Sequence, residues 1–365
     1  MPLSKHSSKT TKIIFITALL LAITSFGYSQ YVRYTYVINT GSTSLNLIHA
    51  DLSYAYEETV EDLSTINNFL SHLSAKHPEL SQLETSRVET LIDIERQAIE
   101  GLFKGFIESH NEYFQLRLIN GIGTELLRVE VPNQASQAII TPISELQNKG
   151  DSQYFNRIRR VEGSSLANKF IFSAPSLNLE NGKIEKPYRP TIRVISTNIA
   201  SGDDSIYLVA NLYADAFLEN GIAQLGPLEE FFAIVNQDGT WFRGLTREQD
   251  YSADLNPSMT MQTSLPESWA YINKRLKNDA TVGYIHADNG QLLHRGLSPS
   301  ENDIRILKTH EEYLNPYLHF LHLILHIPDL DLNQTISAMK DHLGIWFDRE
   351  LRTVKDPSLD ASGHS

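Results

Sequence analysis

The chain has 365 residues, of which 41% are hydrophobic and 21% are charged, so it is long enough to bury a substantial core in about two domains. Its formal net charge of -13 at pH 7 argues against nucleic acid or an anionic lipid surface as the main partner, because both favour Lys and Arg. The absence of cysteine excludes disulfides, thiolate chemistry and cysteine zinc sites.

The first 29 residues predict an export signal. Residues 1–12 contain Lys5, Lys9 and Lys12 and no acidic residue, and the uncharged segment 13–29 that follows is largely apolar. We expect residues 1–12 to stay in the cytoplasm and the chain from about Gln30 to cross the cytoplasmic membrane. The segment 13–29 is short for a spanning helix, so both a retained membrane anchor and a cleaved signal peptide remain open.

The next segment, 31–112, has the periodicity of helices. From about Leu45 to Glu112 apolar residues recur at spacings of three and four, with a break near Pro78. We interpret 31–112 as a helical stalk.

From Tyr113 onwards the pattern changes to short strands and tight turns. Residues 113–226 predict about five strands around a helical or irregular crossing, and 227–330 predict a second set of strands, hairpins and one helix. Residues 331–365 are expected to form a C-terminal helix and a polar tail. The predicted fold class is therefore α+β, with an N-terminal membrane or signal segment, a long helical stalk and two tandem modules that contain antiparallel sheets.

The segment "SLNLENGKIEKPYRPTIR", Ser176 to Arg193, is a rigid loop between two strands. Asn181-Gly182 accepts the positive φ of a tight turn, while Pro187 and Pro190 fix their own φ and exclude a helix. Local chemistry alone therefore indicates a pinned loop between two strands, which can serve as a structural staple.

Four motifs occur in an order that resembles a known family. They are "EYFQLRLINGIGTELLRVEV", "ELQNKGDSQYF", "FIFSAPSLNLENGKIEKPYRPTIRV" and "AIVNQDGTWFRG". Together they resemble the extracytoplasmic double Cache (PAS-like) sensor domains of bacterial sensor histidine kinases and diguanylate cyclases, over roughly Leu45 to Ile327. The resemblance implies a membrane-distal Cache module at 113–226, a membrane-proximal one at 227–330, and a place for the proline loop beside the ligand cavity of the first.

The chain departs from the family in two places. The loop "REQDYSADLNPSMTMQ" replaces an acidic aromatic run that often follows the tryptophan hairpin. After "HFLHLILHIPDLDLNQTI" the expected second membrane helix is missing, and no kinase, cyclase or methyl-accepting region follows. We therefore expect any signal to pass through a separate membrane signalling protein.

Three arginines are the candidate ligand-binding residues. Arg117, Arg128 and Arg193 each lie inside an otherwise apolar strand, where alternation directs a side chain either to solvent or into a cavity. If two or more converge, their guanidinium groups suit a carboxylate or a phosphate. Tyr154 is the expected hydroxyl partner, and Phe155 is expected to line the same pocket. In the alternative, each arginine pairs with a local acid, for example Glu125, Glu130 or Glu185.

Catalytic and metal-binding roles are not expected. His319, His322 and His326 would share one face of a helix and offer a metal site, but in the strand that the family implies only His322 and His326 share a face. No glycine-flanked nucleophile and no phosphate-binding loop occurs. We expect no cofactor, no metal and no enzymatic activity, and a hydrolase on this scaffold would need a site that the sequence does not contain.

The predicted function is that of a ligand-sensing protein in signal transduction. It is expected to bind a small anionic ligand, most simply a carboxylate, and the stalk helices offer a surface for a homodimer. The expected location is the cytoplasmic membrane, with the main domain in the periplasm. The alternative is a free periplasmic small-molecule binding protein with no signalling role, secreted after cleavage of the N-terminal segment.

Overall fold

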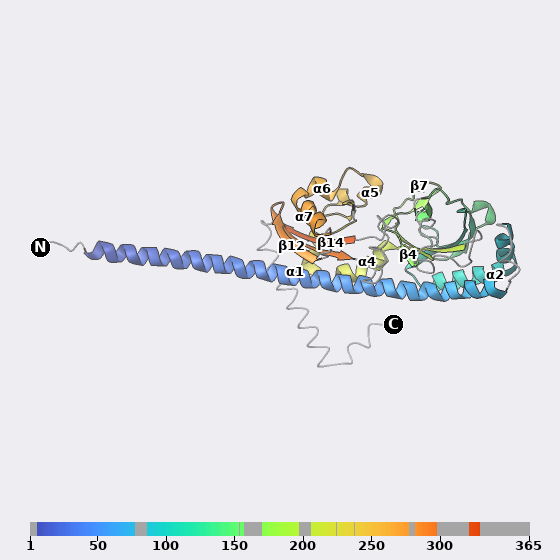
Figure 1. Ribbon diagram of the computed structural model, residues 1–365, viewed down its shortest axis with the longest axis horizontal. Coiled ribbons are helices and arrows are strands. Elements are labelled where there is room, and N and C mark those ends of the chain that lie inside the picture. The colour runs from blue at the N-terminus through green and yellow to red at the C-terminus, as the bar shows by residue number, and fades with distance from the viewer. Residues whose placement is uncertain are drawn as a thin grey trace, which may run out of the picture.

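The fold is α+β, with two antiparallel sheets beside one long helix, and this confirms the predicted class. In Figure 1 the helix forms a straight base, and two globular modules rest on the same side of it. The computed structural model describes residues 6–76, 86–152, 154–156, 170–196, 206–223, 225–236, 238–276, 282–297 and 321–328.

The base of the molecule is α1 (His6–Lys76), a helix of 71 residues. At a rise of about 1.5 Å per residue it is roughly 105 Å long. A second helix, α2 (Ser86–Ser109), lies beside the far end of α1 (Figure 1). Both helices bury a stripe of apolar residues at spacings of three and four, which is why they pack against the modules: Leu45, Ile48, Leu52, Leu63, Ile66, Leu70, Ile99, Phe103 and Ile107.

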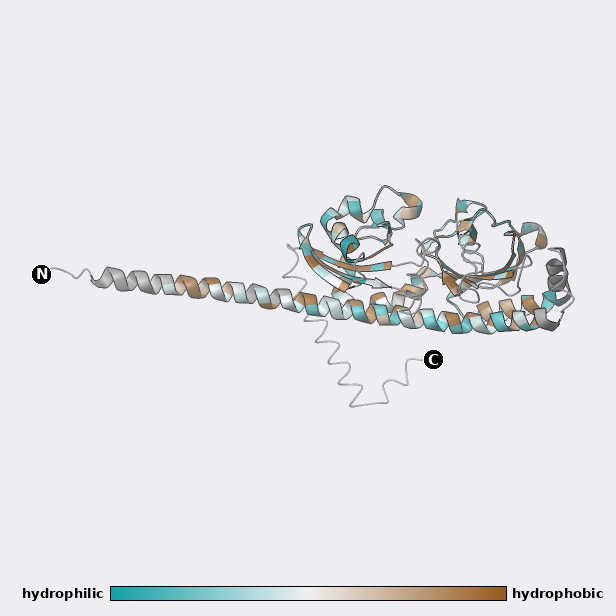
Figure 2. Ribbon diagram, in the orientation of Figure 1, coloured by the Kyte–Doolittle hydropathy of each residue, from teal (hydrophilic) through white to brown (hydrophobic). Residues whose placement is uncertain are grey.

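The N-terminal part of α1 projects beyond the modules (Figure 1). Figure 2 shows a hydrophobic stretch in this projection, where Leu19, Leu21 and Phe26 are 50%, 65% and 67% exposed. In the part of the chain that the structure describes, no helix meets the length and apolarity that a membrane span requires. The membrane segment expected at 13–29 therefore stays a prediction.

The first module is built on an antiparallel sheet of seven strands. Along the main path the strand order is β3-β2-β1-β9-β8-β4, and β5 also pairs with β8. The bounds are β1 (Tyr113–Asn120), β2 (Glu125–Glu130), β3 (Ile139–Ile140), β4 (Phe170–Phe172), β5 (Ser176–Leu177), β8 (Pro190–Ser196) and β9 (Ile206–Tyr213). A short 3-10 helix, η2 (Ile143–Glu145), follows β3.

Strand alternation gives this sheet two different faces. Leu116 and Leu118 of β1, with Leu208 and Ala210 of β9, belong to the main core that includes the buried stripes of α1 and α2. The opposite face carries the residues in between. Near one end these are polar: Arg117, Arg193 and Asn211. The others form a small apolar cluster: Ile119, Ile195, Tyr207 and Val209. The second face is the one that forms a cavity.

The proline loop closes over this second face with a hairpin of its own. Strands β6 (Leu179–Glu180) and β7 (Lys183–Ile184) pair across the Asn181-Gly182 turn, where φ is 51° and 74°. This positive φ is the backbone conformation that the Asn-Gly pair predicts. The Lys186–Pro187 peptide bond is cis.

A short helix, α4 (Ala214–Ala223), connects the modules and lies along α1 (Figure 1). The two helices approach closely at Gly221, where a Cβ atom would lie only 3.2 Å from Ile48 Cγ2. A larger residue at this position would force the helices apart, so the glycine permits the packing. The 3-10 helix η3 (Gly226–Phe231) then leads into the second module.

The second module has an antiparallel sheet of five strands in the order β11-β10-β14-β13-β12. Trp241 and Trp269 lie in the core on one face of this sheet. The bounds are β10 (Phe232–Val235), β11 (Trp241–Arg243), β12 (Val282–Ala287), β13 (Gly290–Leu297), β14 (Leu321–Pro328), η4 (Arg247–Gln249), α5 (Ser252–Leu255), α6 (Met261–Ser264) and α7 (Pro266–Leu276).

The histidine segment forms the strand β14, not a helix. His322 and His326 are four positions apart on this strand, so they share a face, and both are buried, whereas His319 lies outside the described residues. Within the described ranges there is no group of three or more His, Asp or Glu side chains that could hold a metal ion. The expected break near Pro78, the end of the insert after Asn156 and the C-terminal segment 331–365 also lie outside these ranges.

Candidate ligand-binding site

A cavity of about 1030 Å³ opens on the polar face of the first sheet. From the first module its walls are Arg117, Tyr154 and Arg193 together with residues of the segments 146–152 and 173–182. The remaining wall comes from the second module: Asn236, Asp238, Ala253 and Asp254. We call this space the inter-module cavity. Its volume is at the upper limit of the range of about 300–1,000 Å³ for small-molecule sites.

Arg193 is the buried cation at the centre of the site. Its side chain comes from β8, and the residue is 7% exposed. The guanidinium donates to Ser176 Oγ at 2.8 Å and to Asn178 Oδ1 at 3.3 Å, and both acceptors are neutral. Burial lowers the pKa of Arg193 to about 10, which leaves the group charged at neutral pH. Among the described residues this arginine forms no ion pair, so its charge is solvated only by neutral groups.

Arg117 lies close to Arg193, and the positive charge of Arg117 contributes to the lowered pKa of Arg193. Its guanidinium donates to Glu125 Oε1 at 3.3 Å and to Asn211 Oδ1 at 2.9 Å, while its Nε has no partner in the described part of the chain. Glu125 is therefore the acidic partner of Arg117, whereas Arg193 has no acidic partner among the described residues. An anionic ligand would supply the missing negative charge.

Tyr154 lies between the two arginines. Arg117 donates to its hydroxyl at 3.3 Å, and the guanidinium carbons of Arg117 and Arg193 each lie 5.7 Å from the centre of the ring. The aromatic ring thus positions both cations, and its hydroxyl can donate to a ligand oxygen. Three of the five residues predicted from the sequence are brought together here.

Arg128 is directed elsewhere. It is the cross-strand neighbour of Arg117, but it pairs with Glu125 at 3.7 Å, Glu130 at 3.4 Å and Glu180 at 3.6 Å. It does not line the inter-module cavity. For this arginine the structure shows the pairing with local acids that the sequence left open.

Phe155 is fully buried and lies beneath the cavity floor. It packs edge-on against Tyr207, with ring centroids 5.6 Å apart, in a small cluster with Ile119, Ile195 and Val209. Its side chain is not among those that line the cavity. It supports the face of the sheet on which the arginines lie.

The family can be assigned once this arrangement of helix, sheets and cavity is considered with the sequence. The profile described as "Bacterial histidine kinase, sensor domain" matches residues 79–303, which is more than half of the chain. The chain belongs to this family. The resemblance predicted from the four motifs is confirmed.

Solved structures agree with this fold. One is a domain of a putative sensory box/GGDEF family protein from Vibrio parahaemolyticus, with 16% identity and a TM-score of 0.55 over 82% of this chain and 99% of that one. Another is the extracellular domain of the putative histidine kinase vpHK1S-Z8, with 17% identity and a TM-score of 0.53 over 81% and 95% of the two chains. No curated protein sequence matches the chain significantly.

The sensor domain also places residues at the cavity that sequence analysis did not single out. Lys149 lines it, and burial lowers the pKa of this lysine to about 8, with the charge of Arg117 contributing. Ser176 and Asn178 were visible only as part of the proline loop. Asp254 comes from the segment that departs from the family pattern, and no local signal marks it.

The proline loop has both of the roles that the sequence allowed. Its residues Ser176 to Leu179 form one wall of the cavity. Arg189 anchors its end, because the guanidinium stacks over Phe114 at 4.5 Å and donates to Val131 O at 3.1 Å. The loop is thus a staple that holds a cavity wall.

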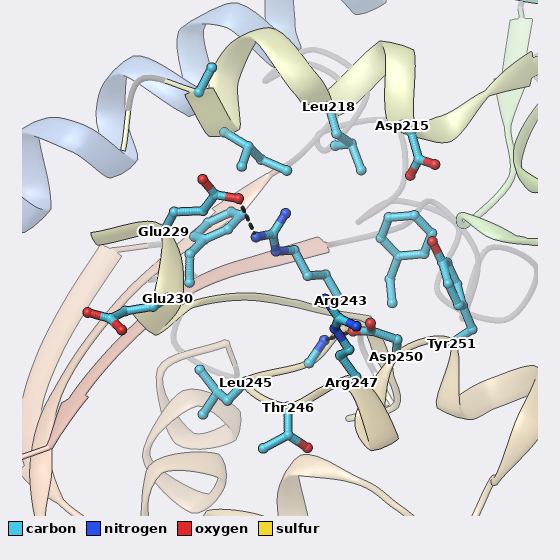
Figure 3. Close-up of a pocket in the computed structure, with 15 residues that line it drawn as sticks. Asp215, Leu218, Glu229, Glu230, Arg243, Leu245, Thr246, Arg247, Asp250 and Tyr251 are labelled. Carbon is cyan, nitrogen blue, oxygen red and sulfur yellow. Dashed lines mark hydrogen bonds and ion pairs between the residues drawn. The ribbon is translucent and has the colours of Figure 1, made fainter. Parts of the chain in front are cut away.

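The sensor domain has a second cavity, of about 870 Å³, between α4 and the second sheet. Figure 3 shows Arg243 reaching Glu229 across it, and the two side chains form an ion pair of 2.9 Å. Asp250 accepts a hydrogen bond from Gly244 N at 2.8 Å. Because these charges already have partners and Arg243 is about a third exposed, this cavity is a weaker candidate for an anion.

Proposed function

We propose that this sensor domain binds a small organic anion in the inter-module cavity. The observation that carries the proposal is the pair of buried guanidinium groups on the cavity wall: Arg117 has one acidic partner, Glu125, and Arg193 bonds only to neutral acceptors among the described residues. A carboxylate that bonds to both would form two or more charge-assisted hydrogen bonds, each worth about 1.5–3 kcal/mol. Tyr154 would donate a further hydrogen bond to the same anion.

The proposed role is sensing in the periplasm, with the signal passed to a separate membrane protein. The family supports a sensory role, because its members are sensor domains of bacterial histidine kinases. α1 supports the route of the signal, since it packs against both modules and extends past them (Figure 1). A ligand shifts the equilibrium between two conformations of the sensor only if it binds one of them more tightly. Because this coupling is reciprocal, a partner that recognises one conformation must alter the apparent ligand affinity.

A thermal shift experiment on the purified full-length chain tests the binding proposal. The panel contains monocarboxylates, dicarboxylates, inorganic phosphate, and neutral amides of the same acids as controls. A ligand that binds only the folded state raises the Tm in a concentration-dependent way. We expect carboxylates to raise the Tm and the matching amides to have no effect. Stabilisation by the neutral amides alone would contradict the proposal.

A further inference from the structure

The second cavity, between α4 and the second sheet, is large enough for a ligand of its own. Its volume of about 870 Å³ lies within the range of about 300–1,000 Å³ for small-molecule sites. It shares no lining residue with the inter-module cavity. Its apolar walls come from α4 and from the second module: Leu218, Ile222, Phe232, Phe242 and Leu245. A molecule bound here is therefore separate from the anion of the first cavity.

The charge on the walls of the second cavity is negative. Four carboxylates line it against two guanidinium groups: Asp215, Glu229, Glu230 and Asp250 against Arg243 and Arg247. In the part of the chain that the structure describes, these acids form no group of three or more that could hold a metal ion. Negative charge spread over partly apolar walls suits an organic cation.

Asp250 is a half-buried carboxylate in this cavity. Its Oδ1 accepts the hydrogen bond of 2.8 Å from Gly244 N–H, and its Oδ2 accepts none from any residue that the structure describes. Burial raises the pKa of Asp250, and this effect exceeds the opposing effects of the Gly244 hydrogen bond and of the charges of Arg243 and Arg247. One oxygen of a partly desolvated carboxylate is thus available to a donor from a ligand.

An aromatic corner lies beside Asp250. The rings of Phe242 and Tyr251 pack edge-on with their centroids 5.2 Å apart, and Tyr251 N–H donates to Phe242 O at 3.1 Å. Burial raises the pKa of the Tyr251 hydroxyl, and the negative charges of Asp215 and Asp250 raise it further. Figure 3 shows Asp215 and Tyr251 on the same side of the cavity. Aromatic rings in a negative potential favour the binding of an ammonium group.

Arg243 shows that this cavity accommodates a cation. Its guanidinium forms the ion pair with Glu229 across the cavity, and its central carbon lies 6.0 Å from the centre of the Phe232 ring (Figure 3). The side chains of the ion pair are 34% and 51% exposed, so the pair is weak and exchanges readily with solvent. A soluble cation can therefore compete for the same kind of surroundings, a carboxylate next to an aromatic ring.

We propose that the second cavity binds a primary organic amine in its ammonium form. The ammonium group donates to Oδ2 of Asp250 beside the Tyr251 ring, and the apolar part of the amine lies on Phe242 and Leu218. The amine contacts α4, which packs against α1 at Gly221, so this site is one helix away from α1. The inference does not depend on the anion site, because the two cavities have different walls.

Matched pairs of amines and alcohols test whether the positive charge matters. Calorimetric titration of the full-length chain uses phenethylamine and phenethyl alcohol, cyclohexylamine and cyclohexanol, and hexylamine and hexanol. Each alcohol keeps the apolar body and a donor but lacks the charge. In at least one pair we expect the amine to bind about tenfold or more tightly than the alcohol.

Variants then assign the amine to the second cavity. Asp250→Asn keeps a carbonyl oxygen for Gly244 N–H but removes the charge, so we expect the amine to bind about tenfold more weakly. Arg243→Gln removes a competing cation and frees Glu229, so we expect the amine to bind about two- to fivefold more tightly. Glu267→Gln changes an exposed acid of α7 that does not line the cavity, and it leaves the affinity unchanged.

Three results would overturn the inference. One is that no amine binds the unmodified chain, and another is that amine and alcohol bind equally in every pair. The third is an amine affinity that stays the same in both Asp250→Asn and Arg243→Gln, because the amine then lies outside the second cavity. If Asp250→Asn does not fold, the gain of affinity in Arg243→Gln relative to Glu267→Gln decides the matter. The loss of a structural contact alone does not produce such a gain.

Discussion

His294 and His322 lie on the neighbouring strands β13 and β14 of the second sheet, with their ring centroids 5.4 Å apart. Both side chains are buried, at 1% and 0% exposure, and none of their four ring nitrogens has a hydrogen-bond partner in the described part of the chain. Burial lowers the pKa of His294 to about 4, with Arg275 contributing, and burial and His294 lower that of His322 to about 3. The pair is therefore neutral in the folded protein at physiological pH.

Stability should fall on mild acidification because of this pair. In the unfolded chain a histidine has a pKa of about 6.5, so the unfolded state binds protons first as the pH decreases. The contribution of the pair is complete above pH 6.5 and is lost as the pH falls from there towards 4. Each histidine contributes a slope of up to about 1.4 kcal/mol per pH unit. Urea unfolding at pH 7.5, 6.0 and 5.0 measures this dependence of the unfolding free energy on pH.

A variant isolates this effect. His322→Leu removes one of the two titrating groups, so we expect a flatter dependence of the unfolding free energy on pH. His286→Gln changes an exposed histidine of β12 in the same sheet and should leave the slope as it was. Both variants keep the other residues on this side of the sheet, so these do not account for a difference in slope: Arg275, Tyr271, Trp269 and His326. An unfolding free energy that is constant from pH 7.5 to 5.0 would contradict the assignment.

Arg128→Ala should destabilise the first module without removing a ligand contact. The change leaves the fully buried carboxylate of Glu125 with one cation fewer, and it also frees Glu130 and Glu180. Breaking such a buried network costs about 3 kcal/mol of unfolding free energy. Arg243→Ala breaks a half-exposed pair and should cost less than about 1 kcal/mol. Equal losses in denaturant titrations would show that Arg128 is not part of a buried network.

Tyr154→Phe should weaken anion binding while the fold is retained. The variant loses the hydroxyl that Arg117 contacts at 3.3 Å but keeps the ring that both guanidinium groups approach. Loss of one hydrogen bond to an anion, worth about 1.5–3 kcal/mol, predicts an affinity decrease of about 10- to 150-fold in calorimetry. Tyr188→Phe, which removes an exposed hydroxyl bonded to Lys186, is the matched control. An unchanged affinity in Tyr154→Phe would place the anion away from this ring.

The mature N-terminus decides between a membrane-anchored sensor and a free binding protein. We expect the chain purified from bacterial membranes to retain residues 13–29, because this apolar segment follows three lysines without an acidic residue. Mass spectrometry of the intact protein measures it. A mature chain that begins near Gln30 and is recovered from the periplasmic fraction would favour the free binding protein.

Much of the architecture could be predicted from the sequence because the local signals are strong and agree with one another. The Asn181-Gly182 turn, the apolar stripes of the helices and the alternation within β1 and β8 each depend on residues close together in the chain. Alternation also predicts that Arg117 and Arg193 point either to solvent or into a cavity. In the folded protein both point into the cavity.

Other parts of the site depend on contacts that no local pattern reveals. Arg117 and Arg128 are cross-strand neighbours with the same pattern, yet Arg128 pairs with Glu130 and Glu180 and does not line the cavity. Phe155 follows Tyr154 directly, yet one turns into the core and the other to the cavity. Asp254 reaches the site only through the packing of one module against the other.

Calorimetric titration of the Arg193→Ala variant tests the central claim most directly. The ligand is the carboxylate that most raises the Tm of the unmodified chain, and Arg243→Ala, which removes an arginine from the second cavity, is the control. Loss of two charge-assisted hydrogen bonds predicts that Arg193→Ala weakens binding by about 100-fold or more, while Arg243→Ala changes it by less than about twofold. An affinity that survives in Arg193→Ala and is lost in Arg243→Ala would move the anion site to the second cavity and contradict the account.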